Sequence, residues 1–161
     1  MEMTFAPREI IQIDDAKICF RNFEGRGDKF NREGDRNFAV IIETEEMRDA
    51  LLERGWNVKT KPPREDGDEP FMYLSVKIKF NDRGPKVHLI SGRSDNILDE
   101  NSIHRLDRIY IASVDMDIRP YDWEVQGKTG RTAYLQSMRV VQSFDDRFDR
   151  GYDEEEEVPF E

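Results

Sequence analysis

The sequence predicts a small, mainly β barrel with short helical insertions. Most of its periodic segments alternate apolar and polar residues with a period of two, which is typical of strands buried on one face. Helix signals are confined to two short segments, and turns rich in Gly, Asn and Asp separate the strands. A length of 161 residues fits one domain with an appendage.

Residues 10–13 and 16–23 are the first segments expected to be extended. Alternation in the second segment places Ile18 and Phe20 on one side. The other side combines two bases with a thiol and a ring, at Lys17, Cys19, Arg21 and Phe23. Residues 24–35 follow as a loop with three glycines and three bases around one aromatic ring.

A strand over residues 36–43 has an apolar centre, which indicates burial on both faces. Thr44 can cap a helix whose first turn contains acids, and Gly55 is placed to end that helix. The polar segment 57–70 contains two adjacent prolines, so we expect an irregular, mobile loop there.

Residues 71–80 form the clearest strand pattern of the chain. Alternate residues from Met72 to Phe80 are apolar and predict a core face. The opposite face carries two rings, a serine and two lysines, at Phe71, Tyr73, Ser75, Lys77 and Lys79. Such a face is unusual for a merely solvated surface. A turn over residues 81–84 then leads into a strand over residues 86–90.

The C-terminal half continues with a short helix over residues 99–107 and a strand over residues 109–119. The strand alternates inward-facing residues from Tyr110 through Ala112 to Ile118. Residues 121–130 read as a hairpin-like connection to the last strand, residues 131–142.

This order of elements fits a five-stranded oligonucleotide-binding (OB) barrel. Its third strand would be doubled into a hairpin, and its first helix would be an insertion. Residues 24–35 and 121–130 would then be the two loops with which such barrels hold single strands. A sandwich of five to seven strands is the alternative.

Charge is unevenly distributed along the chain. Residues 145–161 contain nine acids and two bases, a net charge of −7, whereas residues 1–144 contain 26 acids and 23 bases, a net charge of −3. A block of carboxylates stays solvated, so we expect an OB-like domain over 1–144 and a flexible acidic tail over 145–161. The tail combines five acids with an apolar end that suits a partner protein with a basic-rimmed pocket: Asp153, Glu154, Glu155, Glu156, Glu157, Val158, Pro159 and Phe160.

Several classes of protein are disfavoured. The chain has no apolar run of 18 residues and no secretory signal at its start, so no membrane association is expected. Cys19 is the only cysteine, which excludes intramolecular disulfides and suits a reducing cytoplasm.

Catalytic motifs are weak, and neither a metal nor a cofactor is expected. Gly127-Lys128-Thr129 resembles the end of a phosphate-binding loop, but Asp122 occupies the position of the required glycine and a strand follows instead of a helix. The two histidines lie on separate segments. Asp115 and Asp117 share one strand face, and paired carboxylates can hold Mg²⁺, so a nuclease is kept as an alternative.

Bases interleaved with rings favour binding of an unpaired nucleic-acid strand, because cations pair with phosphates and flat rings stack on bases. The candidate residues are Lys17, Arg21, Phe23, Arg26, Lys29, Phe30, Arg32, Arg36, Trp56, Lys59, Lys61, Tyr73, Lys77, Lys79, Lys128 and Arg131. Each ring could instead belong to the core, and this alternative is strongest for Phe23 and Trp56.

The body resembles a group of phage-encoded single-stranded DNA-binding proteins in four short motifs. These motifs are Asn22-Phe23-Glu24-Gly25, Phe30-Asn31, Gly34-Asp35-Arg36 and Gly55-Trp56-Asn57-Val58-Lys59. The tail resembles the acidic C-terminal peptide of bacterial single-stranded DNA-binding proteins, which ends in Pro-Phe. Here glutamates replace most of the aspartates, and Glu161 follows Phe160. Both resemblances imply an OB barrel with a partner-recruiting tail.

We therefore expect a non-enzymatic protein that binds single-stranded DNA without sequence preference. It would act in phage DNA replication, recombination and repair, in the cytoplasm of the bacterial host, either alone or as a homo-oligomer. Its tail would recruit replication or recombination proteins and compete with DNA for the positively charged surface that binds the strand. The alternatives are a metal-dependent nuclease or junction resolvase using Asp115, Asp117 and Asp122, and a DNA-mimic module that binds a basic protein.

Overall fold

Strand β10 (Lys128–Gln142) is the centre of the fold in the computed structural model, which describes residues 1–63, 65–67 and 70–144. On one side, β10 pairs antiparallel with β9 (Ile111–Val125). On its other side, it pairs in parallel first with β6 (Phe71–Ile78) and then with β7 (Lys86–Ser91). The other elements are β1 (Glu2–Ala6), η1 (Pro7–Glu9), β2 (Ile10–Asp14), β3 (Ile18–Asn22), β4 (Arg36–Ile41), α1 (Glu45–Glu53), β5 (Val58–Lys61), β8 (Ser94–Leu98) and η2 (Ile103–Asp107).

The strand order produces a barrel. The described strands lie in the order β1-β2-β9-β10-β6-β4-β3. Only residues 15–17 separate β2 from β3 in the chain, although the two strands stand near opposite ends of this order. The sheet therefore closes into a ring at this point, and β1 pairs with β2 as a hairpin outside the ring. The Ala16 amide donates to the Val114 carbonyl at 2.8 Å, and the Ile41 amide donates to the Lys17 carbonyl at 2.9 Å. The first barrel strand is therefore bent and bonded to both neighbours, as in the predicted OB barrel.

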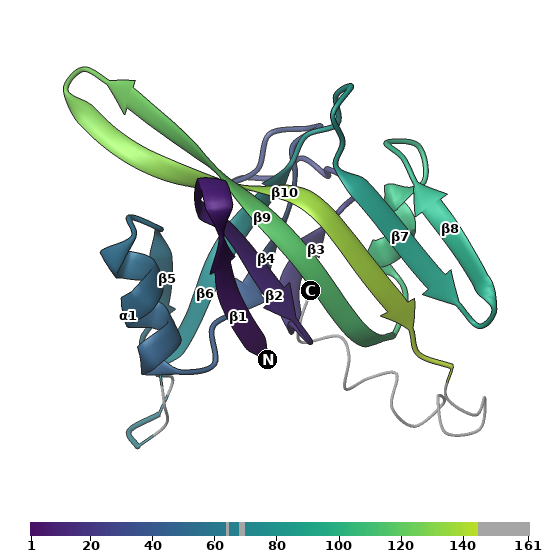
Figure 1. Ribbon diagram of the computed structural model, residues 1–161, viewed down its shortest axis with the longest axis horizontal. Helices are drawn as coiled ribbons and strands as arrows, with labels where there is room; N and C mark the ends of the chain where they lie inside the picture. The colour runs from purple at the N-terminus through teal and green to yellow at the C-terminus, as the bar shows by residue number, and fades with distance from the viewer. Residues whose placement is uncertain (64, 68–69, 145–161) are drawn as a thin grey trace.

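The core fills this barrel with side chains from alternate strand positions. Met72, Leu74, Val76 and Ile78 of β6 are buried as predicted, whereas Ala112 of β9 is exposed although inward orientation was predicted. Figure 1 shows β9 and β10 crossing the molecule, with α1 on one side and the β7–β8 hairpin on the other. The Thr44 hydroxyl oxygen accepts the Met47 amide at 3.1 Å and begins α1, as its sequence predicts.

The parallel pairing forces a turn out of the sheet. Val76 pairs with Ala133, and Lys86 pairs with Ser137. The chain therefore advances by ten residues from β6 to β7, while β10 advances by only four. Residues 79–85 therefore leave the ladder and form a turn between β6 and β7. The predicted hairpin of these two strands is therefore wrong: both run parallel to β10, and β7 takes β8 as its antiparallel partner.

Three other elements differ from the prediction. The segment expected to be irregular contains β5, which pairs antiparallel with β6 just before the two prolines. The hairpin-like connection is a long two-stranded arm, because β9 and β10 continue their pairing as far as Val125 and Lys128. The short helix over residues 99–107 is only the 3-10 turn η2. The predicted acidic tail, residues 145–161, lies outside the described residues.

Replacing a ring in the barrel centre should destabilise the protein. Phe38 is 1% exposed and stacks on Phe23, with ring centroids 5.2 Å apart. Phe38→Ala should lower the free energy of unfolding by about 3–5 kcal/mol, because it removes buried surface and leaves a cavity. Urea denaturation followed by circular dichroism measures this loss. The control is Phe144→Ala, since Phe144 is 59% exposed; an equal effect of both changes would contradict the assignment of the core.

Candidate nucleic-acid interface

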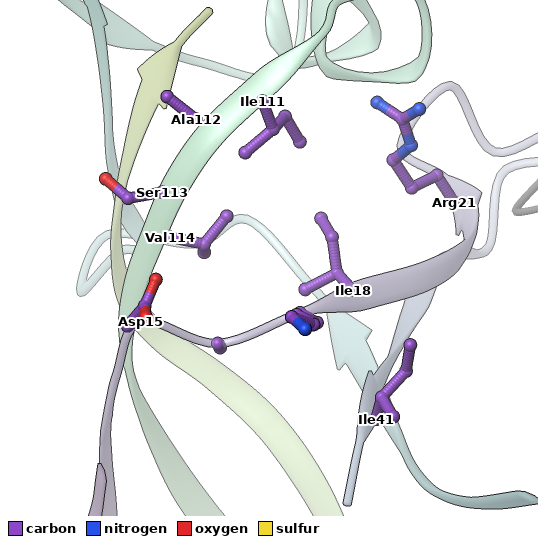
Figure 2. Close-up of a pocket in the computed structure, with 10 residues that line it drawn as sticks. Asp15, Ile18, Arg21, Ile41, Ile111, Ala112, Ser113 and Val114 are labelled. Carbon is purple, nitrogen blue, oxygen red and sulfur yellow. The ribbon is translucent and has the colours of Figure 1, made fainter. Parts of the chain in front are cut away.

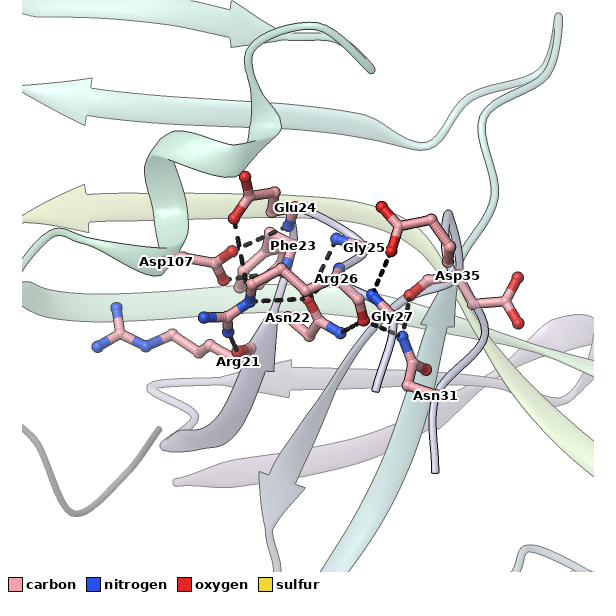
Figure 3. A network of polar contacts seen from close by, with 11 residues as sticks. Arg21, Asn22, Phe23, Glu24, Gly25, Arg26, Gly27, Asn31, Asp35 and Asp107 are labelled. Atoms are coloured by element: carbon pink, nitrogen blue, oxygen red, sulfur yellow. Dashed lines mark hydrogen bonds and ion pairs between the residues drawn. The ribbon is translucent and has the colours of Figure 1, made fainter. Parts of the chain in front are cut away.

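The loop between β3 and β4, residues 24–35, is anchored by a buried carboxylate. Asp107 of η2 is 5% exposed, and its Oδ1 and Oδ2 accept the amides of Phe23 at 2.8 Å and Glu24 at 2.9 Å. Asn22 Oδ1 accepts the amides of Gly25 at 3.1 Å and Arg26 at 2.9 Å. Figure 3 shows these contacts converging on the start of the loop. The first turn of the loop is therefore fixed by charge-assisted hydrogen bonds to Asp107 and by neutral ones to Asn22.

The rest of the loop is held by its own side chains. Asn31 Nδ2 donates to the Arg26 carbonyl at 2.8 Å and to the Asp35 carbonyl at 3.0 Å. Glu33 Oε2 accepts the Gly27 amide at 2.7 Å. Because these polar groups are satisfied within the loop, its remaining bases and its ring face outward. Phe30 is 95% exposed, and Lys29 and Arg32 are also exposed.

The loop forms one wall of a groove of about 600 Å³, which we call the loop groove. Its lining includes Phe30 and Arg32 from the loop, Lys77 and Lys79 from β6 and the following turn, and Tyr134 from β10. Asp35 and Glu100 contribute acids to the same lining. The groove thus brings together bases and rings that are distant in the sequence, which suits phosphates and unstacked bases.

Strand register explains why two cations and a ring lie in one row across β6, β10 and β9. Tyr134 is the register partner of Lys77 on β6 and of Arg119 on β9. Opposite residues of neighbouring strands share a face, so this row presents a base, a ring and a second base. The Arg119 guanidinium lies over the Tyr134 ring, 4.9 Å from its centroid, and the Tyr121 ring meets Tyr134 edge-on at 6.0 Å.

A second group of rings lies further along the outer face of β6, and we call it the ring cluster. Phe20 meets Phe71 at 5.9 Å and Tyr73 at 5.3 Å between ring centroids. The Lys61 ammonium lies over Phe20, 4.9 Å from its centroid. Lys59 is opposite Tyr73 on β5. The outer face of β6 therefore carries the predicted sequence of two rings followed by lysines, with Phe20 added to it.

The prediction missed Phe20 and placed Arg21 and Phe23 on a DNA-facing side, which is wrong. Phe23 is 0% exposed, and Arg21 is 7% exposed and donates to the carbonyls of Leu106 and Ile109 at 2.9 Å each. A register shift lies between Cys19 and Asn22, and Phe20 has a φ of 51°. One extra residue in the strand reverses the alternation, so Phe20 faces outward while Arg21 and Phe23 face the core. The period-two pattern contains no signal for such a bulge.

Two further candidate residues have structural roles. Trp56 is 2% exposed, so it cannot stack on a base in this conformation. Arg131 is 11% exposed, and its guanidinium bonds Asp122 at 2.7 Å, Glu9 at 2.6 Å and the Arg54 carbonyl at 2.9 Å. Hydrogen bonds from Arg131 hold the pKa of the Asp122 carboxyl below its usual value. Arg131 therefore fixes the base of the arm, and its charge is already neutralised.

The other candidates lie at different places. Arg36 lines the loop groove, where its guanidinium lies over Phe80 at 5.7 Å and donates to the Glu100 carbonyl at 3.0 Å. Arg26 is partly engaged within the loop through the Arg21 carbonyl at 3.3 Å. Lys128 is exposed at the tip of the arm, and Lys17 lies apart from the loop groove. Their predicted contact with DNA stays a prediction.

A separate apolar pocket lies at the seam of the barrel, where β3 and β9 diverge. It has a volume of about 260 Å³ and is lined mainly by aliphatic side chains, including Ile18, Ile111 and Val114 (Figure 2). Cys19 lies nearby in the chain but is buried, and this burial raises the pKa of its thiol to about 11 against the influence of Lys61. The thiol is therefore protonated at neutral pH and poorly nucleophilic.

The carboxylates of the nuclease alternative have other partners. Asp115 Oδ1 accepts the Asp15 amide at 2.9 Å, and Asp117 Oδ2 accepts the Ser137 hydroxyl at 3.2 Å. Within the described residues, no group of three or more His, Cys, Asp or Glu side chains is placed to hold a metal ion.

No helix in that same part of the chain is long and apolar enough to span a bilayer.

Fold and site together define an OB-type barrel with a basic, ring-bearing face. Residues 2–160 match the family model described as "Putative phage ssDNA-binding domain", so the chain belongs to this family. The predicted resemblance to phage-encoded single-stranded DNA-binding proteins is confirmed, whereas the resemblance of the tail to the bacterial C-terminal peptide stays a prediction. A search of curated proteins found no match.

Solved structures agree on the fold. The single-stranded DNA-binding protein from bacteriophage Enc34, in its C-terminal truncation, aligns with a TM-score of 0.55 at 13% identity, covering 90% of this chain and 97% of that chain. The same phage protein in complex with ssDNA aligns with a TM-score of 0.55 at 15% identity, covering 90% and 92%. At these identities the likeness shows a shared fold.

Removing the buried carboxylate should loosen the loop. Asp107→Ala leaves the Phe23 and Glu24 amides without their acceptor, which should cost about 1–3 kcal/mol of stability. Amide hydrogen exchange should become faster at these two residues. Asp95→Ala is the control, because exposed Asp95 contacts His88 and no residue of this loop. Unchanged exchange at Phe23 and Glu24 in Asp107→Ala would contradict the anchoring role.

Proposed function

We propose that this chain is a non-enzymatic protein that binds single-stranded DNA without sequence preference, in phage DNA replication, recombination and repair. Residues 1–144 would be the DNA-binding unit, and the protein would work in the cytoplasm of the bacterial host. Membership of the phage ssDNA-binding family supports this proposal. The structure of the Enc34 protein with ssDNA adds support, because that protein has the same fold.

The observation that carries the proposal is the continuous outer face of β6. Its alternate residues run from the ring cluster at Phe71 and Tyr73, past Ser75, to Lys77 and Lys79 in the loop groove. At about 3.3 Å per residue, Phe71 and Lys79 are roughly 26 Å apart, which is enough for several nucleotides. Rings at both ends and lysines in the groove match the stacking and charge of an unpaired strand.

The absence of sequence preference follows from the chemistry of the face. Lysine and arginine side chains meet phosphates, which are the same at every nucleotide. Aromatic rings stack on any base, because every base has a flat face. The described groove therefore suits binding through backbone and stacking, with little readout of base edges.

Fluorescence titration with oligo-dT tests the proposal. The affinity should fall as salt rises, with a slope of about −0.7 per phosphate contact. Phe30→Ala should weaken binding by about 1–3 kcal/mol, because it removes one stacking platform. Lys77→Gln/Lys79→Gln should make the salt slope shallower by about 1.4.

The matched control for the ring is Phe144→Ala, since Phe144 is also exposed but lies outside the loop groove. Oligo-dT binding that is absent, or indifferent to salt, would refute the proposal. Equal losses in Phe30→Ala and Phe144→Ala would refute the role of the loop groove.

We further propose that residues 145–161 recruit replication or recombination proteins and compete with DNA for the basic face. The net charge of −7 in this segment is the supporting observation, because a carboxylate run can occupy sites that otherwise hold phosphates. The apolar residues Val158–Phe160 would supply the contact that a partner's pocket recognises.

Deleting residues 145–161 should tighten oligo-dT binding and abolish capture of partner proteins. The gain in affinity should be largest at low salt, because screening weakens the competing charge. Titration of the full-length and shortened chains at two salt concentrations measures it. A control chain that keeps the length but carries Gln at Glu154–Glu157 separates charge from length. Weaker DNA binding by the shortened chain would contradict the competition.

A further inference from the structure

A second groove adjoins the loop groove, and we call it the basic groove. It has a volume of about 700 Å³ and lies between η1, the turn after β6 and the base of the β9–β10 arm. Lys79 lines both grooves. Arg119 of the second groove lies over the ring of Tyr134 of the first, 4.9 Å from its centroid. The two grooves are therefore neighbours along one surface.

The charge of the basic groove is of one sign. Four of its lining residues are bases, Arg8, Lys79, Arg83 and Arg119, and none is an acid. Within the described part of the chain, no carboxylate pairs with any of these four side chains. Three arginines around one hollow repel one another unless an anion lies between them. Arginine also offers planar donor pairs that fit phosphate oxygens.

The backbone of η1 is strained at the residue that reaches this groove. Arg8 and Glu9 have φ values of 66° and 61°, in the left-handed region that costs non-glycine residues about 1 kcal/mol or more each. The Glu9 carboxylate accepts from Arg131 at 2.6 Å, which ties this turn to the base of the arm. This ion pair holds η1 in place, and Arg8 of the same turn lines the groove.

We propose that the basic groove binds the phosphate backbone of the same DNA strand where it leaves the loop groove past Lys79. Arg8 and Arg83 would hold successive phosphates, and Arg119 would hold the strand at the junction through its position over Tyr134. This proposal rests on the proposed function and extends it, since it gives the bound strand a path beyond the loop groove and a longer footprint. None of the predicted DNA-binding residues except Lys79 lines this groove.

The test compares oligo-dT of about 4 and about 16 nucleotides, the two ends of the range covered by OB barrels. The full-length chain is compared with Arg8→Gln/Arg83→Gln. Glutamine keeps a side chain at the strained position, so the backbone cost is the same in both proteins. Because the variant leaves two phosphates without a cation, the salt slope for the long oligonucleotide should become shallower by about 1.4, and the slope for the short one should not change.

Arg93→Gln/Arg139→Gln is the charge-matched control, because both residues are exposed and neither lines a described groove. Arg83→Lys keeps the charge and should retain most of the long-oligonucleotide affinity. Equal changes for the two lengths, or the same change in the control pair, would overturn the proposal. Tighter binding of the long oligonucleotide by Arg8→Gln/Arg83→Gln would also overturn it, and would identify the acidic tail as the occupant. A full-length chain that binds neither length would instead refute the proposed function itself.

Discussion

The parallel pairing of β10 with both β6 and β7 is the constraint on which the basic, ring-bearing face depends. One edge of β10 cannot hold the whole segment from β6 to β7, so residues 79–85 leave the sheet between them. That turn carries Lys79 and Arg83 to the surface beside the β9–β10 ladder. The same ladder places Tyr134 between Lys77 and Arg119. Residues from four parts of the chain thus meet on one face, because backbone hydrogen bonds set their register.

A nearly neutral body can still present a strongly basic face, because its acids and bases are used differently. Asp107 is buried, and its carboxylate accepts the backbone amides of the loop. Asp122 and Glu9 are paired with Arg131 at the base of the arm. Bases such as Lys77, Lys79 and Arg83 have no such role in the described residues and are left to the solvent. Net charge alone does not report this division, whereas the local potential does.

Periodicity in the sequence was a good guide wherever a strand is regular. The faces of β6 were predicted correctly, because every second residue from Met72 to Ile78 is buried. The prediction from periodicity failed at β3, because a bulge near Phe20 exchanges the inward and outward faces of the strand after that residue. Arg21 and Phe23 are therefore buried. The prediction also failed for β5 and for the arm, whose strands are stabilised by partners distant in the sequence. A strand rich in lysine and threonine has no local signal strong enough to predict such pairing.

The sequence by itself determined the class of fold, the core face of β6, the polar loop rich in bases, and the concentration of net negative charge in the C-terminal segment. These properties depend on local alternation and on composition, which can be read without a partner strand. Only the tertiary structure decided which rings are exposed, which arginines are neutralised, and which bases line a common groove. Those outcomes depend on strand register, on a bulge and on ladder pairing, and each of them involves residues that are far apart in the chain.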